Sequence, residues 1–303
     1  MNRLLVIVVT YNAMPWAERC FNSLKNSSTP NDIFVIDNGS ADGTQSYICQ
    51  HVPSAIFVQS EKNLGFGAAN NEGLKYALSH SYDYVYLLNQ DAWVMPDTFE
   101  ILIQMHKNHP EYGVLSPMQL ERNGRRFDYN FRTFISRYKK TFNSPLIDDL
   151  YFNDLTDVYD VEFVMAAHWL ISLHCIQVVG GFSPIFHHYG EDDNYLHRIS
   201  FHKFKVGIVP KAKAIHDREN RIISKQKIIF FKYYNYWLIT LSHPNNARGN
   251  IFPFALMKDA ISKAIFMHSF TPIRYCGNIL FNYHRIRNTR KKSLQEECAF
   301  LHS

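Results

Sequence analysis

The 303-residue sequence has few of the features that mark secreted or membrane-spanning proteins. No run approaches the roughly 18 apolar residues of a membrane-spanning helix, and the longest candidate, 251–267, is interrupted by charged residues. The apolar run at 4–9 is too short for a signal-peptide core and lacks a cleavage pattern. The cysteines form no CxxC pair and are odd in number, which argues against a disulfide framework or a cysteine zinc site and favours a reducing, cytoplasmic compartment. They are Cys20, Cys49, Cys175, Cys276 and Cys298.

Acidic residues are scarce in the last quarter of the chain. Residues 225–303 contain 12 Lys and Arg against 3 Asp and Glu, whereas the rest contains 20 against 24. This imbalance favours an anionic partner, which could be a membrane, a nucleic acid or a polyanionic substrate. A solvated helical face is the simpler alternative, and no recognised nucleic-acid-binding module is present.

Short apolar runs alternate with helix-like stretches in the first half of the sequence. This alternation is typical of βαβ units and predicts an α/β fold with a mostly parallel sheet. We expect an α/β domain over 1–224 and a basic, amphipathic helical extension over 225–303, with loops and a hairpin at 120–160. The expected strands are 4–9, 33–36, 56–58, 84–88 and 206–210, and the expected helices are 15–25, 44–51, 67–78, 228–241, 252–270 and 279–286.

Polar residues follow three of the expected strands. They are Thr10-Tyr11-Asn12, Asp37-Asn38-Gly39-Ser40 and Asn89-Gln90-Asp91. Ligands of open α/β sheets bind at the carboxyl ends of the strands, so three such ends in one sheet predict a binding site. An Asx turn is the structural alternative at Asp37, and a helix N-cap is the alternative at Asp91.

Two groups of carboxylates have the chemistry of a cation ligand or a general base. Asp91 offers oxygen ligands to a hard cation such as Mg²⁺ or Mn²⁺, which often shares its site with substrate phosphates. The adjacent carboxylates of Glu191, Asp192 and Asp193 repel one another, which raises carboxylate pKa values and suits a general base. Compensation of a helix dipole is the alternative explanation for part of this cluster.

Taken in order, these segments resemble the family 2 glycosyltransferases, which are inverting enzymes of the GT-A fold. The Asn-Leu-Gly-Phe-Gly form of one segment is most similar to rhamnosyltransferase-type members that build bacterial surface polysaccharides. The segments that carry the resemblance are Val8–Asn12, Val35–Thr44, Asn63–Gly67, Leu88–Asp91, Val179–Phe182 and Gly190–Asp193.

The resemblance assigns a role to individual residues. It implies Asp192 as the catalytic base, and Asp91 and His216 as ligands of Mg²⁺ or Mn²⁺. Asn89 stands where the family's DxD motif has its first Asp, which leaves Asp91 as the only carboxylate of that motif. On the acceptor side we place Glu191, Asp193, His168 and Trp169. Donor binding is assigned to Thr10, Tyr11, Asn12, Asp37, Asn63, Gly67, Asn70, Asn89 and Gln90.

The resemblance implies transfer of a sugar, with inversion, from a nucleotide-diphospho-sugar to a hydroxyl of a glycan or lipid-linked glycan. Two alternatives are a sugar nucleotidyltransferase and a non-catalytic module that binds nucleotide sugars or carbohydrates. The first is expected to carry a Gly-rich, basic signature after the first strand, and Thr10-Tyr11-Asn12-Ala13 is not one.

The C-terminal extension predicts peripheral contact with the inner face of the cell membrane. Aromatic residues at 230–238 lie near Lys225, Lys227 and Lys232, and a basic run follows at 285–292. Interleaved aromatic and basic residues suit a helix in the interface of an anionic bilayer. Alternatively, the aromatic residues pack against the α/β domain and leave only the basic run exposed.

Overall fold

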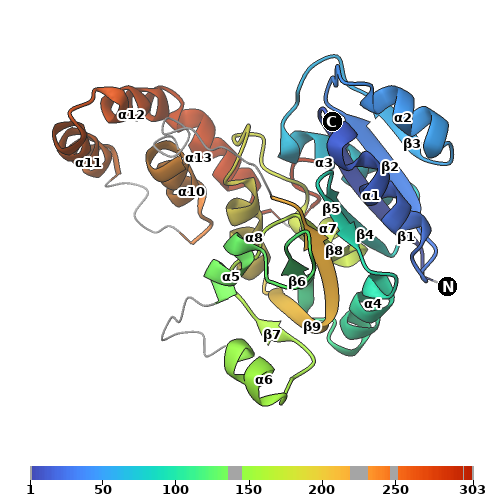
Figure 1. Ribbon diagram of the computed structural model, residues 1–303. Coiled ribbons are helices and arrows are strands. Elements are labelled where there is room, and N and C mark those ends of the chain that lie inside the picture. Colours follow the sequence, from blue (N-terminus) through green and yellow to red (C-terminus); the bar gives the residue numbers. More distant parts are fainter. Residues whose placement is uncertain (1, 136–144, 219–230, 246–251, 296, 302–303) are drawn as a thin grey trace.

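A nine-stranded mixed sheet runs through the part of the chain that the structure describes. The computed structural model describes residues 2–135, 145–218, 231–245, 252–295 and 297–301. The sheet has the order β3-β2-β1-β4-β8-β6-β9-β5, with β7 paired to β9 (Figure 1). The strands are β1 (Leu4–Thr10), β2 (Asp32–Asp37), β3 (Ile56–Gln59), β4 (Tyr84–Asn89), β5 (Ala92–Val94), β6 (Tyr112–Leu120), β7 (Tyr159–Asp160), β8 (His168–Ser172) and β9 (Lys205–His216).

The first four strands are parallel and confirm the predicted βαβ units. Strand β1 pairs with both β2 and β4, and β2 pairs with β3, all in parallel. The connecting helices lie within a few residues of their predicted bounds, because buried strands and intervening amphipathic helices leave a clear pattern in the sequence. These helices are α1 (Met14–Lys25), α2 (Thr44–His51) and α3 (Phe66–Ser79).

The other half of the sheet is mixed and was predicted less well. Strand β8 pairs antiparallel with β4 and β6, whereas β6 and β9 are parallel. The loops and hairpin expected at 120–160 are present in part, since the chain reverses at 119–128 through an antiparallel bridge between Leu120 and Phe127. The described part of this region also contains two short helices and strand β7, which were not predicted. The helices of this half are α4 (Thr98–Asn108), α5 (Tyr129–Ile135), α6 (Leu146–Phe152), α7 (Leu173–Val179) and α8 (Glu191–Phe201).

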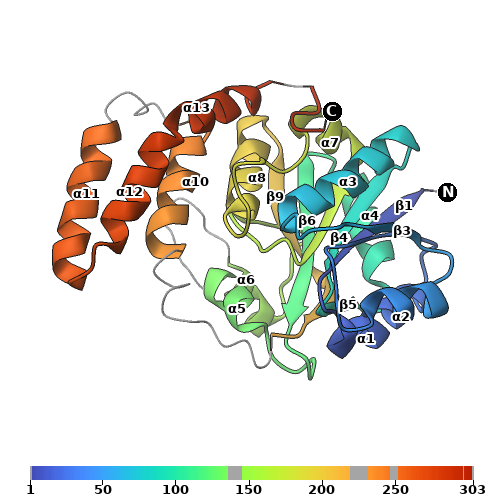
Figure 2. The ribbon, with the colours of Figure 1, turned by 90° about the horizontal axis from the view of Figure 1, so that it is seen from above.

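The hydrophobic core has two layers, one on each face of the sheet. Alternate residues of β1 point to opposite faces, so Leu5 and Ile7 belong to one layer and Leu4, Val6 and Val8 to the other. Helices α3, α7 and α8 cover the first layer, and α1, α2 and α4 cover the second (Figure 2). This double cover explains why β1 reads as a continuous apolar run.

The C-terminal helices form a separate group beside α8 (Figures 1 and 2). Asn194 Nδ2 donates to Ser242 Oγ at 3.0 Å and so joins α8 to α10. The predicted helix at 279–286 is in fact the junction of α12 and α13 at Asn282, and the predicted boundary at 224/225 lies outside the described residues. The elements are η1 (Phe231–Asn235, a π-helical turn), α10 (Tyr236–Ser242), α11 (Phe252–Met267), α12 (Thr271–Phe281) and α13 (Tyr283–Lys292).

The described end of the chain returns to the α/β domain. The backbone N–H of Gly181 donates to Ala299 O at 2.8 Å, and Leu301 packs into the core on the α8 face of the sheet. No helix within the described ranges is both long and apolar enough to cross a bilayer.

Candidate active site

Strand register brings the three predicted polar ends to one edge of the sheet. Thr10 of β1 pairs with Asp37 of β2, and Val9 of β1 pairs with Asn89 of β4. The polar residues after these strands therefore share the carboxyl edge of the parallel half, where ligands of such sheets bind.

Asp37 is fully buried and holds this edge together. Its carboxylate accepts from Thr10 Oγ1 at 2.7 Å, from the Ser40 N–H at 2.8 Å and from Gln59 Nε2 at 2.9 Å. Burial by itself raises the pKa of Asp37, but these hydrogen bonds, together with one from the Ser40 hydroxyl, outweigh it and leave the pKa below its ordinary value. The turn predicted as an alternative is thus present, with its carboxylate ionised.

Gln90 fixes the backbone of Tyr11 from the neighbouring strand. Its Oε1 accepts from the Tyr11 N–H at 2.6 Å, and its Nε2 donates to the Tyr11 carbonyl at 3.1 Å. Asn12 has φ +53° and accepts from the Ala41 N–H at 2.9 Å. Tyr11, whose backbone is held in this way, has 48% of its surface exposed at the edge of the sheet.

The glycine-containing segment at 63–70 packs closely against the segment before α8. A Cβ atom on Gly67 would lie 2.9 Å from Phe182 Cβ and 3.6 Å from Glu191 Cβ. Gly65 has φ +83°, which side-chain-bearing residues rarely adopt, and a Cβ atom on Gly65 would clash with His187 O. Asn63 is exposed, whereas Asn70 is buried and donates to Phe66 O at 2.9 Å.

Asp91 and His216 lie side by side, as the resemblance implies. Ala92 of β5 pairs with His216 of β9, and His216 Nε2 is 3.5 Å from Asp91 Oδ1. Both side chains are buried, and neither ring nitrogen of His216 has a well-directed hydrogen-bond partner among the described residues. Burial lowers the pKa of His216, against the opposing effect of Asp91, so the ring is neutral at neutral pH.

The acidic cluster occupies the first turn of α8. Burial raises the pKa of Asp192, an effect that the charge of Arg218 partly offsets, and Asp192 Oδ1 accepts from the Asp193 N–H at 3.0 Å. Burial and the charge of Asp192 also raise the pKa values of Glu191 and Asp193. Because carboxylates at a helix N-terminus interact favourably with its dipole, the structural alternative for this cluster also holds.

His168 and Trp169 are fully buried in β8 and do not form a surface for an acceptor. His168 Nε2 lies 2.9 Å from Ile215 O and must carry the proton, because a carbonyl only accepts. Its Nδ1 then accepts from Tyr86 Oη at 2.9 Å. Burial lowers the pKa of His168 to about 3. The structure thus gives His168 a supporting role next to His216, and we leave both residues out of the acceptor site.

Three residues that support the site had no assigned role in the sequence analysis. Asn71 brackets Phe182, since its Nδ2 donates to Phe182 O at 2.9 Å and its Oδ1 accepts from the Phe182 N–H at 2.7 Å. Arg198 is fully buried and donates to the carbonyls of Gly181 and Val179. Arg218 lies 2.9 Å from Asp128, and its charge partly offsets the raised pKa of Asp192 and adds to the lowering of the pKa of His216. No periodic pattern marks these contacts.

Comparison with known families decides the class of this protein. The model of glycosyl transferase family 2 matches residues 5–169, which carry β1–β5, the polar carboxyl edge of the parallel strands and Asp91. The chain belongs to this family. The chain is therefore a glycosyltransferase, and the nucleotidyltransferase alternative is wrong.

Two relatives of this glycosyltransferase are about a quarter identical to it over the aligned residues. The N-acetylglucosaminyl-diphospho-decaprenol L-rhamnosyltransferase of Mycobacterium tuberculosis is 26% identical over 235 residues, which cover 71% of this chain and 76% of that protein. The low-salt glycan biosynthesis hexosyltransferase Agl10 of Haloferax volcanii is 22% identical over 219 residues, covering 72% and 68%. The rhamnosyltransferase-like resemblance is thereby confirmed.

Solved structures confirm the predicted GT-A-like fold. S. aureus TarS aligns with a TM-score of 0.56 and 16% identity over 97% of this chain, which spans 55% of the TarS chain. Residues 1–349 of TarS in complex with UDP give a TM-score of 0.53 at 16% identity, with 97% and 90% covered. GalNAc-T7 with UDP, GalNAc and Mn²⁺ gives 0.56 at 14% identity, with 94% and 58% covered.

Proposed function

We propose that this glycosyltransferase transfers a hexosyl or rhamnosyl residue, with inversion, from a nucleotide-diphospho-sugar to a glycan or lipid-linked glycan of a bacterial surface polysaccharide. The observation that carries the proposal is the shared edge of β1, β2 and β4, which joins a preorganised polar network to Asp91 and His216. The rhamnosyltransferase and hexosyltransferase relatives support the sugar class.

The nucleoside of the donor would lie along the edge that Asp37 organises. Tyr11 offers an exposed ring on a fixed backbone, which suits stacking on a base. Thr10, Asn12 and Asp37 set the shape of this edge, and Asn63 is the exposed polar residue of the adjoining glycine-containing segment. Gly67 and Asn70 contribute by letting that segment pack tightly.

The residues at the end of β4 suit a divalent cation. Asp91 provides carboxylate oxygens, and His216 provides a neutral ring whose nitrogens have no well-directed partner among the described residues. Two protein ligands are enough when substrate phosphates supply the others, which is typical of Mg²⁺ and Mn²⁺ sites. No group of three or more potential metal ligands occurs in the described chain, so the substrate phosphates would have to complete the coordination. When bound, the cation would neutralise negative charge on the departing nucleoside diphosphate.

Asp192 is our choice for the general base. It lies in the first turn of α8, beside the segment that Gly67 contacts and within the field of Arg218. It would take the proton from the acceptor hydroxyl as that oxygen attacks the anomeric carbon, while the bond to the nucleoside diphosphate breaks. Glu191 and Asp193, which flank it, would face the acceptor side.

The enzyme would act at the inner surface of the cell membrane, where a lipid-linked acceptor is found. The excess of basic residues after residue 225 supports this location.

A donor panel tests the proposal. Purified protein is screened by thermal shift against nucleotide sugars with Mn²⁺, because a ligand that binds the folded state raises the melting temperature. Release of nucleoside diphosphate is then measured for the best donor, with and without EDTA. Stabilisation by at least one donor together with metal-dependent release supports the proposal. Donor binding without turnover on any acceptor would instead favour the non-catalytic binding module.

A further inference from the structure

The α11–α12 hairpin carries an unusual concentration of exposed apolar side chains. Eight of the 17 large hydrophobic residues that are exposed in the described ranges lie on these two helices or at their junction. Phe254, Phe266, Phe270 and Phe281 are each 82–90% exposed. We call the whole set the outer face: Phe254, Met257, Ile261, Ile265, Phe266, Phe270, Ile273 and Phe281.

The exposed apolar residues of the outer face mostly follow the helical repeat. Phe254, Met257, Ile261 and Ile265 recur at intervals of three or four residues and so line one side of α11. Phe270, Ile273 and Phe281 lie close to one side of α12. In Figures 1 and 2, α11 is the helix farthest from the sheet, with α12 between it and the α10 and α13 pair. Most of the outer face therefore lies on the sides of α11 and α12 opposite their buried residues, which are Leu256, Ala260, Pro272, Cys276 and Ile279.

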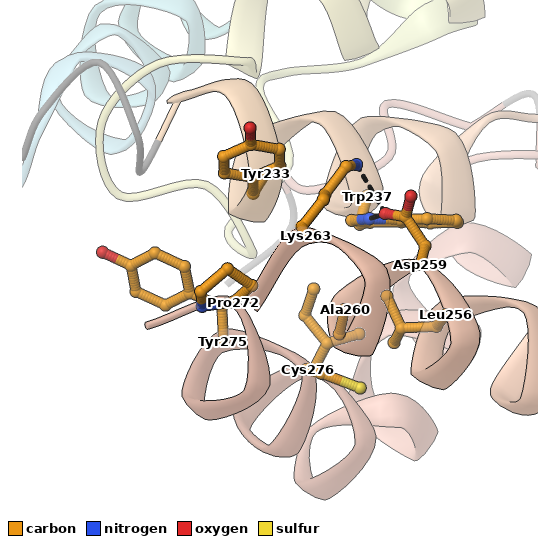
Figure 3. A pocket seen from close by; sticks show the side chains of 10 residues that line it. Tyr233, Trp237, Leu256, Asp259, Ala260, Lys263, Pro272, Tyr275 and Cys276 are labelled. Atoms are coloured by element: carbon orange, nitrogen blue, oxygen red, sulfur yellow. Dashed lines mark hydrogen bonds and ion pairs between the residues drawn. The ribbon is translucent and has the colours of Figure 1, made fainter. Parts of the chain in front are cut away.

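Interactions on the opposite side of α11 fix this orientation. Asp259 accepts from Trp237 Nε1 at 2.9 Å and from Lys263 Nζ at 2.5 Å, and Lys263 also lies 4.6 Å from the centre of the Tyr233 ring. Figure 3 shows these side chains converging in a hollow between η1, α10, α11 and α12. Leu238 is buried in the same helical group. The aromatic residues that the sequence analysis assigned to the membrane between 233 and 238 thus mostly pack inward, apart from Tyr236, which is 56% exposed.

The exposed charged residues of α11, α12 and α13 around the outer face are basic. Asp259 is the only acidic residue of α11, α12 and α13, and it faces inward in its pair with Lys263. Lys258 and Arg274 are exposed beside the outer face. Further exposed basic residues lie on α13: Arg285, Arg287, Lys291 and Lys292.

We propose that the outer face inserts into the interface of an anionic bilayer, with the basic residues of α13 held at the lipid headgroups. This inference rests on the proposed membrane location and names the surface responsible. Apolar residues with flanking Lys and Arg are what an interfacial helix requires, and a patch of this extent is rarely left exposed to water. A second copy of the chain is disfavoured as the partner, because pairing would bring like charges together.

Docking through this surface would keep the acceptor side near the membrane. Helix α10 lies between the hairpin and α8, and a Cβ atom on Gly190, the N-cap of α8, would lie 3.1 Å from Ile239 of α10. The acidic turn of α8 is thus one helix away from the hairpin, where a lipid-linked hydroxyl would be presented.

Vesicle co-sedimentation of the full chain tests the proposal. The outer-face variant replaces Phe254, Ile265, Phe270 and Phe281 with Ser. The control replaces three aromatic residues of α5 and α6 that are 70–83% exposed, Tyr129, Tyr151 and Phe152, with Ser. The charge variant replaces Arg285, Arg287, Lys291 and Lys292 with Gln. Each is measured on phosphatidylcholine vesicles with and without phosphatidylglycerol, at low and high salt.

We expect the wild-type chain and the control variant to bind the vesicles that contain phosphatidylglycerol. The outer-face variant should bind them at least about tenfold more weakly, and the charge variant should lose the preference for phosphatidylglycerol. Absence of wild-type binding at low salt, or equal binding by the outer-face variant, overturns the proposal. So does a wild-type dimer in sedimentation velocity that the outer-face variant dissociates, because the outer face then serves self-association.

A second readout does not depend on multiple substitutions. Phe281→Trp places a new tryptophan on the outer face, and its emission should shift to the blue with vesicles that contain phosphatidylglycerol; an unchanged spectrum contradicts insertion. Asp192→Asn separates this inference from the proposed activity. Loss of transfer with wild-type vesicle binding supports both, whereas vesicle binding by a wild-type chain that transfers no sugar refutes the activity and supports the docking surface.

Discussion

The site contains two buried acidic regions, and they differ in how their charge is compensated. Asp37 is fully buried and accepts hydrogen bonds from Thr10, Ser40 and Gln59, so it is ionised and its surroundings are ordered. Glu191 is buried too, but its Oε2 has no hydrogen-bond partner among the described residues. Under the proposed function, the rigid edge binds the donor, and the acidic cluster of α8, which has an unpartnered carboxylate oxygen, is available for proton transfer.

The largest expected effect is on the rate of transfer, after substitution in the acidic cluster of α8. Asp192→Asn should lower the rate of transfer by about 10²–10⁴-fold and leave donor affinity nearly unchanged, because an amide keeps the size of the carboxylate but takes no proton. Transfer to acceptor and donor affinity are measured separately. Asp193→Asn is the matched control in the same turn of α8. If Asp193→Asn loses transfer and Asp192→Asn does not, the base has been assigned to the wrong residue.

A smaller effect is expected at the proposed cation site at the end of β4. Asp91→Ala should weaken donor binding in the presence of Mn²⁺ by about tenfold or more and abolish the response to metal, with a smaller loss for His216→Ala. Calorimetric titration of the donor with and without EDTA provides the measurement. Asp97→Ala, an exposed residue a few positions further on, is the control. Full activity of all variants in EDTA would indicate a transferase that works without metal.

Removing the charge of the rigid edge should cost folding stability. Asp37→Asn leaves buried donors facing an amide and should lower the free energy of unfolding by about 1–3 kcal/mol. Because the pKa of Asp37 is lowered in the folded state, its contribution is full above its ordinary pKa and is lost as the pH falls through the folded value. The difference from wild type in urea unfolding should therefore shrink in acid. The exposed Asp154→Asn is the control, and equal stability of both variants would contradict the role of Asp37.

The smallest effect on stability is expected for Glu191→Gln, and its pH dependence should have the opposite sign to that of Asp37→Asn. Burial and the charge of Asp192 raise the pKa of Glu191, so the folded state keeps a proton that the unfolded state releases above the ordinary carboxylate pKa. The free energy of unfolding of the wild type should therefore fall as the pH rises above the ordinary carboxylate pKa. For the Gln variant this fall should be smaller by about 1 kcal/mol. Melting temperatures across the pH range measure this. Parallel curves for the two proteins would contradict the raised pKa.

The sequence by itself determined the parallel half of the fold and its polar edge. Strands β1, β2, β3 and β4 are recognisable because each is a short apolar run followed by a helical stretch. Thr10, Asp37 and Asn89 could be grouped in advance, because the carboxyl ends of neighbouring parallel strands must share an edge. Local pattern and chain connectivity were sufficient here.

Outside the parallel half of the sheet, only the tertiary structure decided which residues are buried and which are exposed. His168 looked like an acceptor-side residue but hydrogen-bonds Tyr86 and Ile215 inside the sheet. Trp237, an expected membrane aromatic, is half-buried against Asp259, while Phe281 is 90% exposed. A helix that is apolar on all sides does not reveal which side its neighbours will cover. That choice depends on contacts between residues far apart in the chain, and the local pattern of the sequence does not contain them.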